Sequence, residues 1–199
     1  QECGLNSAMR HHEITSEASP NTLAGSFTPD LVSSKTWLCS QLKKELGDRS
    51  AGDIYILGSW YGNTGVFLQQ ANIKFDRLIM VETRPRLLAT ARRLLEPLYR
   101  EGRLKLVLGR AEQIVYPDRP ITVINTSAND MSRVWFQRVP RGTLTVIQSR
   151  DAVKDVKVIT DTAAQFYAKF PLENTVYWGR RRLRDPETRY TRYMKIGYK

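Results

Sequence analysis

Gly58-Ser-Trp-Tyr-Gly-Asn-Thr-Gly65 is a glycine-rich stretch that directly follows the short apolar run Asp53-Ile-Tyr-Ile-Leu57. Because glycine lacks a Cβ atom, it adopts positive φ angles readily and lets another group come close to the backbone. The apolar run predicts a strand, and residues 66–71 predict a helix. The order of strand, glycine-rich turn and helix indicates a ligand site at the carboxyl end of the strand. Taken alone, the glycines also suit a purely structural turn.

The pattern of strand followed by helix repeats along the chain. Residues 77–82 (Arg-Leu-Ile-Met-Val-Glu) form a second apolar run, which ends in an acid, and residues 84–101 carry apolar side chains at helical spacing. Further strands are predicted at residues 104–108, 121–125 and 143–148, with a helix over 131–138 between the last two. Alternating strands and helices predict a mostly parallel sheet that is covered on both faces.

The two ends of this region differ from the repeating units. Residues 29–46 predict an amphipathic helix, with Asp30 or Ser34 as the N-cap and Gly47 as the stop. Residues 175–178 and 190–198 are aromatic-rich strand candidates, joined by a basic stretch that is too short for a crossover helix. A connection of this length predicts an antiparallel hairpin at the end of the chain.

Glu82 ends the second predicted strand, about 20 residues after the glycine-rich turn, at a spacing known from nucleotide-binding units. A carboxylate in this position can accept hydrogen bonds from both hydroxyls of a ribose. The alternative is a structural acid at the start of a helix that pairs with Arg84 or Arg86.

Together these features resemble the class I S-adenosylmethionine-dependent methyltransferase family over residues 30–199. The resemblance implies a three-layer Rossmann-like α/β fold and S-adenosylmethionine as the cofactor. In that family an acid is commonest where Arg110 stands, which leaves recognition of the adenine open, with Ala111 and Glu112 as the nearest substitutes. The implied cofactor-binding residues are Gly58, Ser59, Trp60, Tyr61, Gly62, Gly65, Glu82, Arg110, Ala111, Glu112 and Asn125. Trp60 and Tyr61 could cover the adenosine or pack against the first helix.

The segment Asn125-Thr-Ser-Ala-Asn-Asp130 closes the fourth predicted strand, where the resemblance places the transferred methyl group. Methyl transfer depends mainly on in-line positioning of the acceptor. Asn125 and Ser127 are therefore candidates to orient an acceptor amine or hydroxyl, and Asp130 to take its proton. The alternative is that the segment only caps the following helix.

The same segment, with residues 139–149 and 193–198, also looks like small methyltransferase-like proteins encoded by bacteriophages. In those relatives Cys-Glu-His commonly follows Asn-Thr-Ser, whereas this chain has Ala128-Asn129-Asp130. The departure raises an alternative function, a catalytically degenerate fold kept as a nucleic-acid-binding or assembly subunit, for example in a virus particle.

The chain carries 31 Lys and Arg against 20 Asp and Glu, a formal charge of +11, which favours a polyanionic partner. The basic stretch of the predicted hairpin lies among aromatic residues, a composition suited to phosphate contact and base stacking. Its candidate nucleic-acid-binding residues are Arg180, Arg181, Arg182 and Arg184. RNA or DNA is the expected acceptor, although strands of a hairpin also carry charges on one face for structural reasons.

The length of 199 residues predicts one folded domain over residues 30–199, preceded by an irregular arm over residues 1–29. The arm is expected to become ordered by docking, for instance on a partner subunit. No apolar run is long enough to cross a bilayer, so a cytoplasmic protein, or one in a virion, is expected. Cys3, His11 and His12 lack the spacing of a metal site, and no metal is expected.

Overall fold

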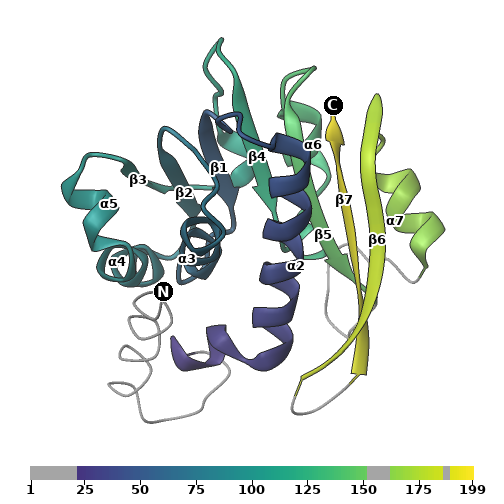
Figure 1. The fold of residues 1–199 in the computed structure, drawn as a ribbon, viewed down its shortest axis with the longest axis horizontal. Coiled ribbons are helices and arrows are strands. Elements are labelled where there is room, and N and C mark those ends of the chain that lie inside the picture. The colour runs from purple at the N-terminus through teal and green to yellow at the C-terminus, as the bar shows by residue number, and fades with distance from the viewer. Residues whose placement is uncertain (1–21, 152–161, 186–188) are drawn as a thin grey trace.

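In the computed structural model, which describes residues 22–151, 162–185 and 189–199, the chain forms an α/β fold around one sheet (Figure 1). Within these residues the sheet has seven strands in the order β3-β2-β1-β4-β5-β7-β6. Strands β1 to β5 pair in parallel, and β7 pairs antiparallel with both β5 and β6. The prediction of a mostly parallel sheet with a terminal antiparallel hairpin is confirmed. The strands are β1 Asp53–Leu57, β2 Leu78–Glu82, β3 Leu104–Leu108, β4 Ile121–Asn125, β5 Leu144–Arg150, β6 Asn174–Arg184 and β7 Arg189–Tyr198.

Helices cover both faces of the sheet. One face packs against α2 (Pro29–Leu46), α3 (Asn63–Gln70), α4 (Pro85–Leu94) and α5 (Glu96–Arg100), and the other against α6 (Val134–Arg138) and α7 (Ala163–Lys169). The described residues also form short 3-10 turns outside these helices, namely η1 (Ala24–Phe27), η2 (Ala111–Gln113) and η3 (Ala128–Asp130). Since side chains of a strand alternate between the two faces, each strand supplies residues to two apolar layers.

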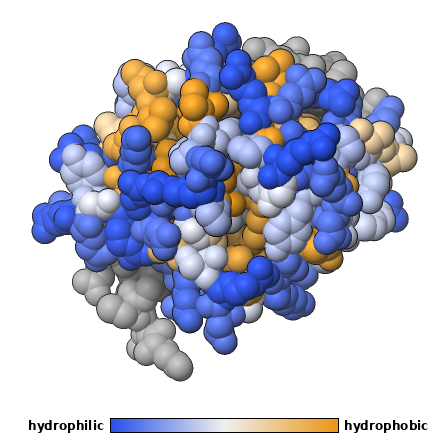
Figure 2. All heavy atoms as spheres, turned by 90° about the horizontal axis from the view of Figure 1, so that it is seen from above, coloured by the Kyte–Doolittle hydropathy of each residue, from blue (hydrophilic) through white to orange (hydrophobic). Residues whose placement is uncertain are grey.

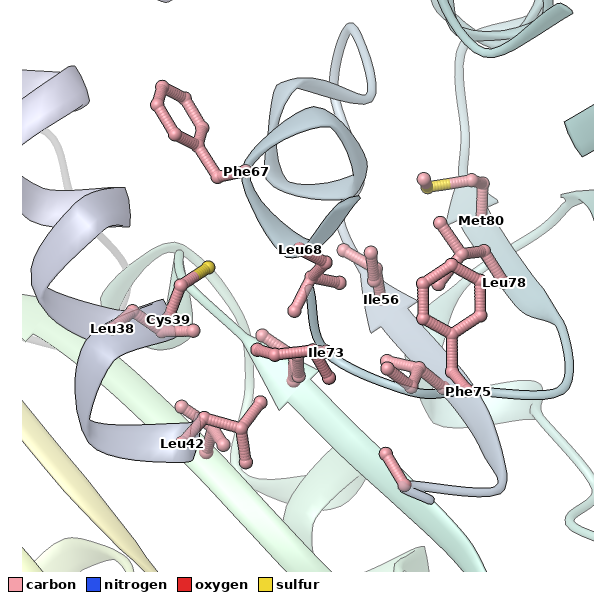
Figure 3. Close-up of a cluster of buried hydrophobic side chains, with 14 of the residues drawn as sticks. Leu38, Cys39, Leu42, Ile56, Phe67, Leu68, Ile73, Phe75, Leu78 and Met80 are labelled. Atoms are coloured by element: carbon pink, nitrogen blue, oxygen red, sulfur yellow. The ribbon is translucent and has the colours of Figure 1, made fainter. Parts of the chain in front are cut away.

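The larger apolar layer lies between the sheet and helices α2 and α3 (Figure 3). Leu38 and Leu42 of α2, Leu68 of α3 and Ile56 of β1 all belong to this layer, and all four side chains are fully buried. Burying one such side chain contributes about 1.5–3 kcal/mol to folding. This layer fixes α2 and α3 on the sheet, and with them the loop that precedes α3.

The glycine stop of α2 is confirmed, because Gly47 follows the helix at φ +58° and donates its N–H to the carbonyl of Lys43. The predicted N-caps are wrong. The helix begins at Pro29 after Thr28, and Asp30 and Ser34 lie inside it. Their side chains instead contact the hairpin and β5.

The predicted helix over residues 84–101 is two helices, because α4 ends at Leu94 and α5 begins at Glu96. Pro97 cannot donate a backbone hydrogen bond and its ring crowds the preceding turn, so it interrupts a helix that the apolar spacing alone would continue. The helix predicted from residue 131 begins at Val134. The basic stretch Arg180–Arg184, expected as a connection, belongs to β6.

The described residues that precede α2 pack against the folded domain. The carbonyl of Ser26 accepts a 2.7 Å hydrogen bond from Asn63 Nδ2, and the Phe27 ring lies 6.1 Å from that of Phe67. Cys3, His11 and His12 lie outside the described residues, as does most of the predicted arm.

Within the described ranges no helix is long and apolar enough to cross a membrane, and no cluster of three metal-ligating side chains occurs. Seen from above, hydrophilic residues surround smaller apolar areas (Figure 2).

Candidate functional site

The glycine-rich loop leaves β1 at Gly58 and enters α3 at Asn63, at the carboxyl edge of the sheet. Gly58, Trp60 and Gly62 all have positive φ, at +64°, +51° and +83°. A Cβ atom on Gly62 would lie 2.8 Å from Ala91 Cβ, and one on Gly65 would lie 2.8 Å from Met80 Cε. These two glycines therefore permit close packing inside the domain. Gly58 is different, because it faces the segment that follows β4.

Glu82 links the loop that follows β1 to the carboxyl end of β2. Its side chain is 5% exposed, and Oε2 accepts a 3.1 Å hydrogen bond from the backbone N–H of Trp60. Oε1 accepts from the backbone N–H groups of Thr83 and Arg84 at 3.0 and 3.2 Å. The Arg84 guanidinium also pairs with Oε1 at 3.2 Å, as the structural alternative predicted. The carboxylate therefore holds the glycine-rich loop against the end of β2.

Two further side chains of the loop are buried. Ser59 is 2% exposed, and its Oγ has no hydrogen-bond partner in the described structure. Tyr61 is also buried, and the half-buried Trp60 ring lies 5.0 Å from it. An unpartnered buried hydroxyl is costly, so Ser59 Oγ is a group that a bound molecule could satisfy.

The three candidates after β3 point to different surroundings. Arg110 is exposed, Ala111 is buried in the second apolar layer, and Glu112 accepts a 2.8 Å hydrogen bond from Ser132 Oγ. The backbone of Gly109 donates to the carbonyl of Glu82 at 3.0 Å. The loop after β3 thus lies beside Glu82, but the Glu112 carboxylate is engaged with the segment after β4.

Asn125 ends β4 in full burial and organises the turn that follows. Its Oδ1 accepts from the backbone N–H of Ser127 at 2.9 Å, and its Nδ2 donates to the sulfur of Met131 at 3.3 Å. Neither η3 nor α6 has a side-chain N-cap, so the reading of this segment as a helix cap is wrong. Asn125 instead holds an Asx-type turn at the strand end.

Asp130 lies on the same turn and is exposed. Asn129 Nδ2 donates to its Oδ1 at 2.8 Å. Desolvation by surrounding groups raises the pKa of Asp130, while the positive charges of Arg150 and Arg192 lower it. A carboxyl group with a raised pKa is a better proton acceptor.

Met131 is a residue of this site that the sequence reasoning did not identify. A Cβ atom on Gly58 would clash with Met131 Cε, so the Met131 methyl group occupies the space that the absent side chain leaves. A methionine in a polar segment gives no signal of this contact in the sequence. The glycine-rich loop, Glu82 and the turn after β4 therefore meet at the carboxyl edge, with Met131 over Gly58.

The four candidate arginines of the hairpin do not form one patch. Cross-strand pairing places Arg180, Arg182 and Arg184 on one face of β6 and Arg181 on the other. Arg181 lies 5.0 Å from the Trp37 ring of α2. Trp178 is 52% exposed and shares the face of the first three arginines. This face lies on the edge strand, separated from β4 by β5 and β7.

Comparisons with known proteins identify the fold. No family model and no curated protein matches the chain, but many solved structures do. The N-methyltransferase NodS from Bradyrhizobium japonicum WM9 is 13% identical with a TM-score of 0.65, over 87% of this chain and 99% of that one. PH1948 from Pyrococcus horikoshii, a proposed RNA methyltransferase, is 13% identical with a TM-score of 0.65, over 98% of both chains.

The cyclase SpnF has the same fold at a TM-score of 0.54 and 11% identity, over 73% of this chain and 60% of that one. A shared fold at this level of identity does not fix the reaction. The sheet order, the terminal antiparallel strand and these structural likenesses establish that the chain has the class I methyltransferase fold.

Proposed function

We propose that the protein binds S-adenosylmethionine at the carboxyl edge of β1, β2 and β4 and transfers its methyl group to an acceptor. The observation that carries this proposal is the hydrogen bond from Trp60 N–H to Glu82 Oε2, which joins the glycine-rich loop to the acid at the end of β2. In the methyltransferase fold, this is the junction that the resemblance assigns to the nucleoside of the cofactor.

The residues at this junction fit the cofactor. Glu82 offers a buried carboxylate to the ribose hydroxyls, and Ser59 Oγ, in the same loop, has no hydrogen-bond partner within the described ranges. The absent side chain of Gly58 leaves room that Met131 now fills, and a flexible methionine can vacate it by rotating its side chain. The bound cofactor would supply an activated methyl group, and the chain would supply binding and orientation.

The turn after β4 is suited to positioning the acceptor. Asn125 is fixed by its bonds to Ser127 and Met131, while Asp130 is exposed beside it. Asp130 would take the proton of the acceptor, in keeping with the raised pKa of its carboxyl group. Ser127 would donate or accept a hydrogen bond to orient the acceptor.

A nucleic acid, RNA or DNA, is the acceptor that we propose. The net charge of +11 supports this, as does the face of β6 that presents Arg180, Arg182 and Arg184 next to Trp178. Phosphates would contact the arginines and a base would stack on the indole. PH1948, with the same fold, is described as a proposed RNA methyltransferase, which is consistent with this acceptor class.

A binding or assembly module without catalysis is the second candidate. It is favoured by Met131 over Gly58 and by the exposed Arg110 at the position where the family commonly has an acid. The resemblance to phage-encoded proteins, a location in a virion and docking of the predicted arm on a partner subunit belong to this candidate as predictions. A cytoplasmic location is a prediction for either candidate.

Calorimetric titration with S-adenosylmethionine and S-adenosylhomocysteine separates the two candidates. We expect the wild-type protein to bind both and Glu82→Ala to bind at least tenfold more weakly, because a charged hydrogen bond contributes about 1.5–3 kcal/mol. Glu96→Gln, on the exposed side of α5, is the matched control and should bind like the wild type. Absence of binding by folded wild-type protein would refute the proposed function.

Transfer of a labelled methyl group to total RNA or to DNA, assayed separately, then identifies the acceptor. If the protein binds the cofactor but labels neither polymer, the proposed nucleic-acid acceptor is contradicted. The proposed cofactor site is not affected by that result. Breakdown of the cofactor without added acceptor would indicate a different reaction at the same site.

A further inference from the structure

Three arginines form a row across neighbouring strands at the carboxyl edge of β5. Arg150 of β5 is the register partner of Arg192 of β7, and Arg192 is the register partner of Arg181 of β6. Register partners point to the same face of a sheet, so all three side chains lie on the face that α2 covers. Like charges directly opposite one another on neighbouring strands repel, which makes this row unusual unless a negative charge lies nearby.

The centre of the row is buried and incompletely bonded. Arg192 is only 6% exposed, and one of its terminal nitrogens donates to the carbonyl of Thr126 at 3.2 Å. Its Nε is buried without a hydrogen-bond partner in the described structure. Thr126 directly follows β4, so the row lies next to the turn that carries Ser127 and Asp130.

Lys35 of α2 adds a fourth cation on this face and is 5% exposed. Burial, together with the charge of Arg192, lowers the pKa of Lys35 to about 7, although the Cys39 side chain one turn along the helix opposes this shift. Among residues 22–151, 162–185 and 189–199, neither Lys35 nor Arg192 forms an ion pair with a carboxylate.

The acids near the row are engaged elsewhere or lie at its rim. Asp30 Oδ2 accepts a 2.6 Å hydrogen bond from the Tyr190 hydroxyl, while its Oδ1 is buried and has no partner among the described residues. Asp151 Oδ1 accepts from the backbone N–H of Thr191, and Asp130 is exposed. Within the part of the chain that the structure describes, the cations at the centre therefore outnumber the acids that face them.

We propose that Arg192 and Lys35, with Arg150 and Arg181 on either side, bind a phosphate group of the acceptor beside the turn after β4. An oxyanion offers several acceptors at once and would satisfy the free Nε of Arg192 and the Lys35 ammonium together. The unpartnered Asp30 Oδ1 would suit a hydroxyl of the same ligand. This site is distinct from the face of Arg180, Arg182 and Arg184, which lies on the other side of the sheet. The proposal rests on the proposed function for its acceptor, but the phosphate site can be tested by itself.

Inorganic phosphate is the probe, and the readout is the midpoint of thermal unfolding at constant ionic strength, with chloride as the balancing anion. Phosphate is expected to raise the midpoint of the wild type, because a ligand that binds only the folded state stabilises it. The Arg192→Gln variant should lose this response. The matched control is Arg93→Gln, an exposed arginine of α4 that lies in neither proposed phosphate-binding region, which should respond like the wild type.

Lys35→Met keeps the test valid if Arg192→Gln does not fold. Without phosphate this variant should unfold at a higher temperature than the wild type, since it removes a buried like charge, and it should lose the response to phosphate. An equal response of wild type and Lys35→Met, or loss of the response in Arg93→Gln, would overturn the proposal.

A second arm distinguishes the acceptor from the cofactor as the source of the anion. The phosphate response should persist in the presence of saturating S-adenosylhomocysteine, because the two ligands occupy different places. If S-adenosylhomocysteine abolishes it, the cations hold the carboxylate of the cofactor and the assignment to the acceptor is wrong. Failure of the protein to bind S-adenosylhomocysteine at all would instead contradict the proposed function and leave the phosphate result unaffected.

Discussion

The Met131 methyl group fills the space beside Gly58, and a cofactor bound at the glycine-rich loop would need that space. The Met131 methyl group lies where a Gly58 side chain would begin, and its sulfur accepts from Asn125. We expect Met131→Ala to bind S-adenosylhomocysteine more tightly than the wild type, because the truncated side chain no longer competes for the space. Calorimetric titration measures the dissociation constants. Met131→Leu keeps the volume and should differ little, and weaker binding by Met131→Ala would show that the side chain supports the cofactor instead.

Lys35 should make folding stability depend on pH. Burial, with the charge of Arg192, lowers its pKa in the folded state to about 7, while Cys39 opposes the shift. In unfolded chains the pKa of lysine is about 10.4, so above pH 7 the unfolded state binds more protons and the free energy of unfolding rises with pH. One such group contributes at most about 1.4 kcal/mol per pH unit.

Urea unfolding between pH 7 and pH 9 measures this effect. We expect the stability of the wild type to rise over this window, with a smaller rise in Lys35→Met. The pKa of Lys195 is also lowered, to about 8, so part of the rise should remain in the variant. The pKa of the Cys39 thiol is raised to about 12, and its opposite effect sets in as the thiol of the unfolded state titrates, at about pH 8.5, in the upper part of this window. Identical slopes for the two proteins would contradict a buried, partly neutral Lys35.

Some residues could be predicted because their pattern is local in the sequence. Others were missed because their partners lie far away along the chain. The positions of Gly58 and Glu82 at strand ends could be predicted, because a glycine-rich turn and an acid after two successive strands follow from local pattern. The contacts of Met131 with Gly58 and of Lys35 with Arg192 join segments that only the folded sheet brings together. No spacing in the sequence reports them.

At the scale of elements, the strands were predicted more accurately than the helices. Short apolar runs bounded by turn residues define β1 to β5 well. Helix α7 was not predicted, since its seven residues show no clear apolar period. Its start is set by a capping box in which Thr162 and Gln165 bond reciprocally, and Lys195 of β7 donates to the carbonyls of Tyr167 and Phe170. The sequence pattern does not report such contacts, because they join distant segments of the chain or depend on the placement of a few atoms.

Strand β6 gives a prediction that depends on its alternation. Arg180, Arg182 and Arg184 share a face with Trp178, so replacing the three arginines by Gln should weaken binding of single-stranded RNA. Each lost phosphate contact lowers the slope of log affinity against log salt by about 0.7 for a single strand. Fluorescence anisotropy at several salt concentrations measures both quantities.

The control for this triple variant removes the same charge from the other edge of the sheet. Arg86, Arg93 and Lys105 are all exposed around α4 and β3, and their replacement by Gln should leave most of the affinity and slope unchanged. Equal losses in the two triple variants would mean that RNA responds to net charge only, and that the face of β6 is not a specific site.

At the scale of the whole molecule, the candidate cofactor site joins loops from β1, β2 and β4, which are adjacent in the middle of the sheet. A ligand bound there contacts segments that separate when the domain unfolds, so its binding energy should stabilise the whole domain rather than one loop. S-adenosylhomocysteine at 100 times its dissociation constant should raise the free energy of unfolding by about 2.7 kcal/mol. Urea denaturation with and without the ligand measures this difference.

The Glu82→Ala variant tests whether the gain in stability comes from ligand binding at this site. At the ligand concentration used for the wild type, this variant should gain much less stability, because its affinity is lower, whereas Glu96→Gln should gain as much as the wild type. Two unfolding transitions, with only one of them shifted by the ligand, would contradict a single domain built around one sheet. A single transition that shifts as a unit is the expected result, since the strands on either side of the site belong to the same seven-stranded sheet of the described residues.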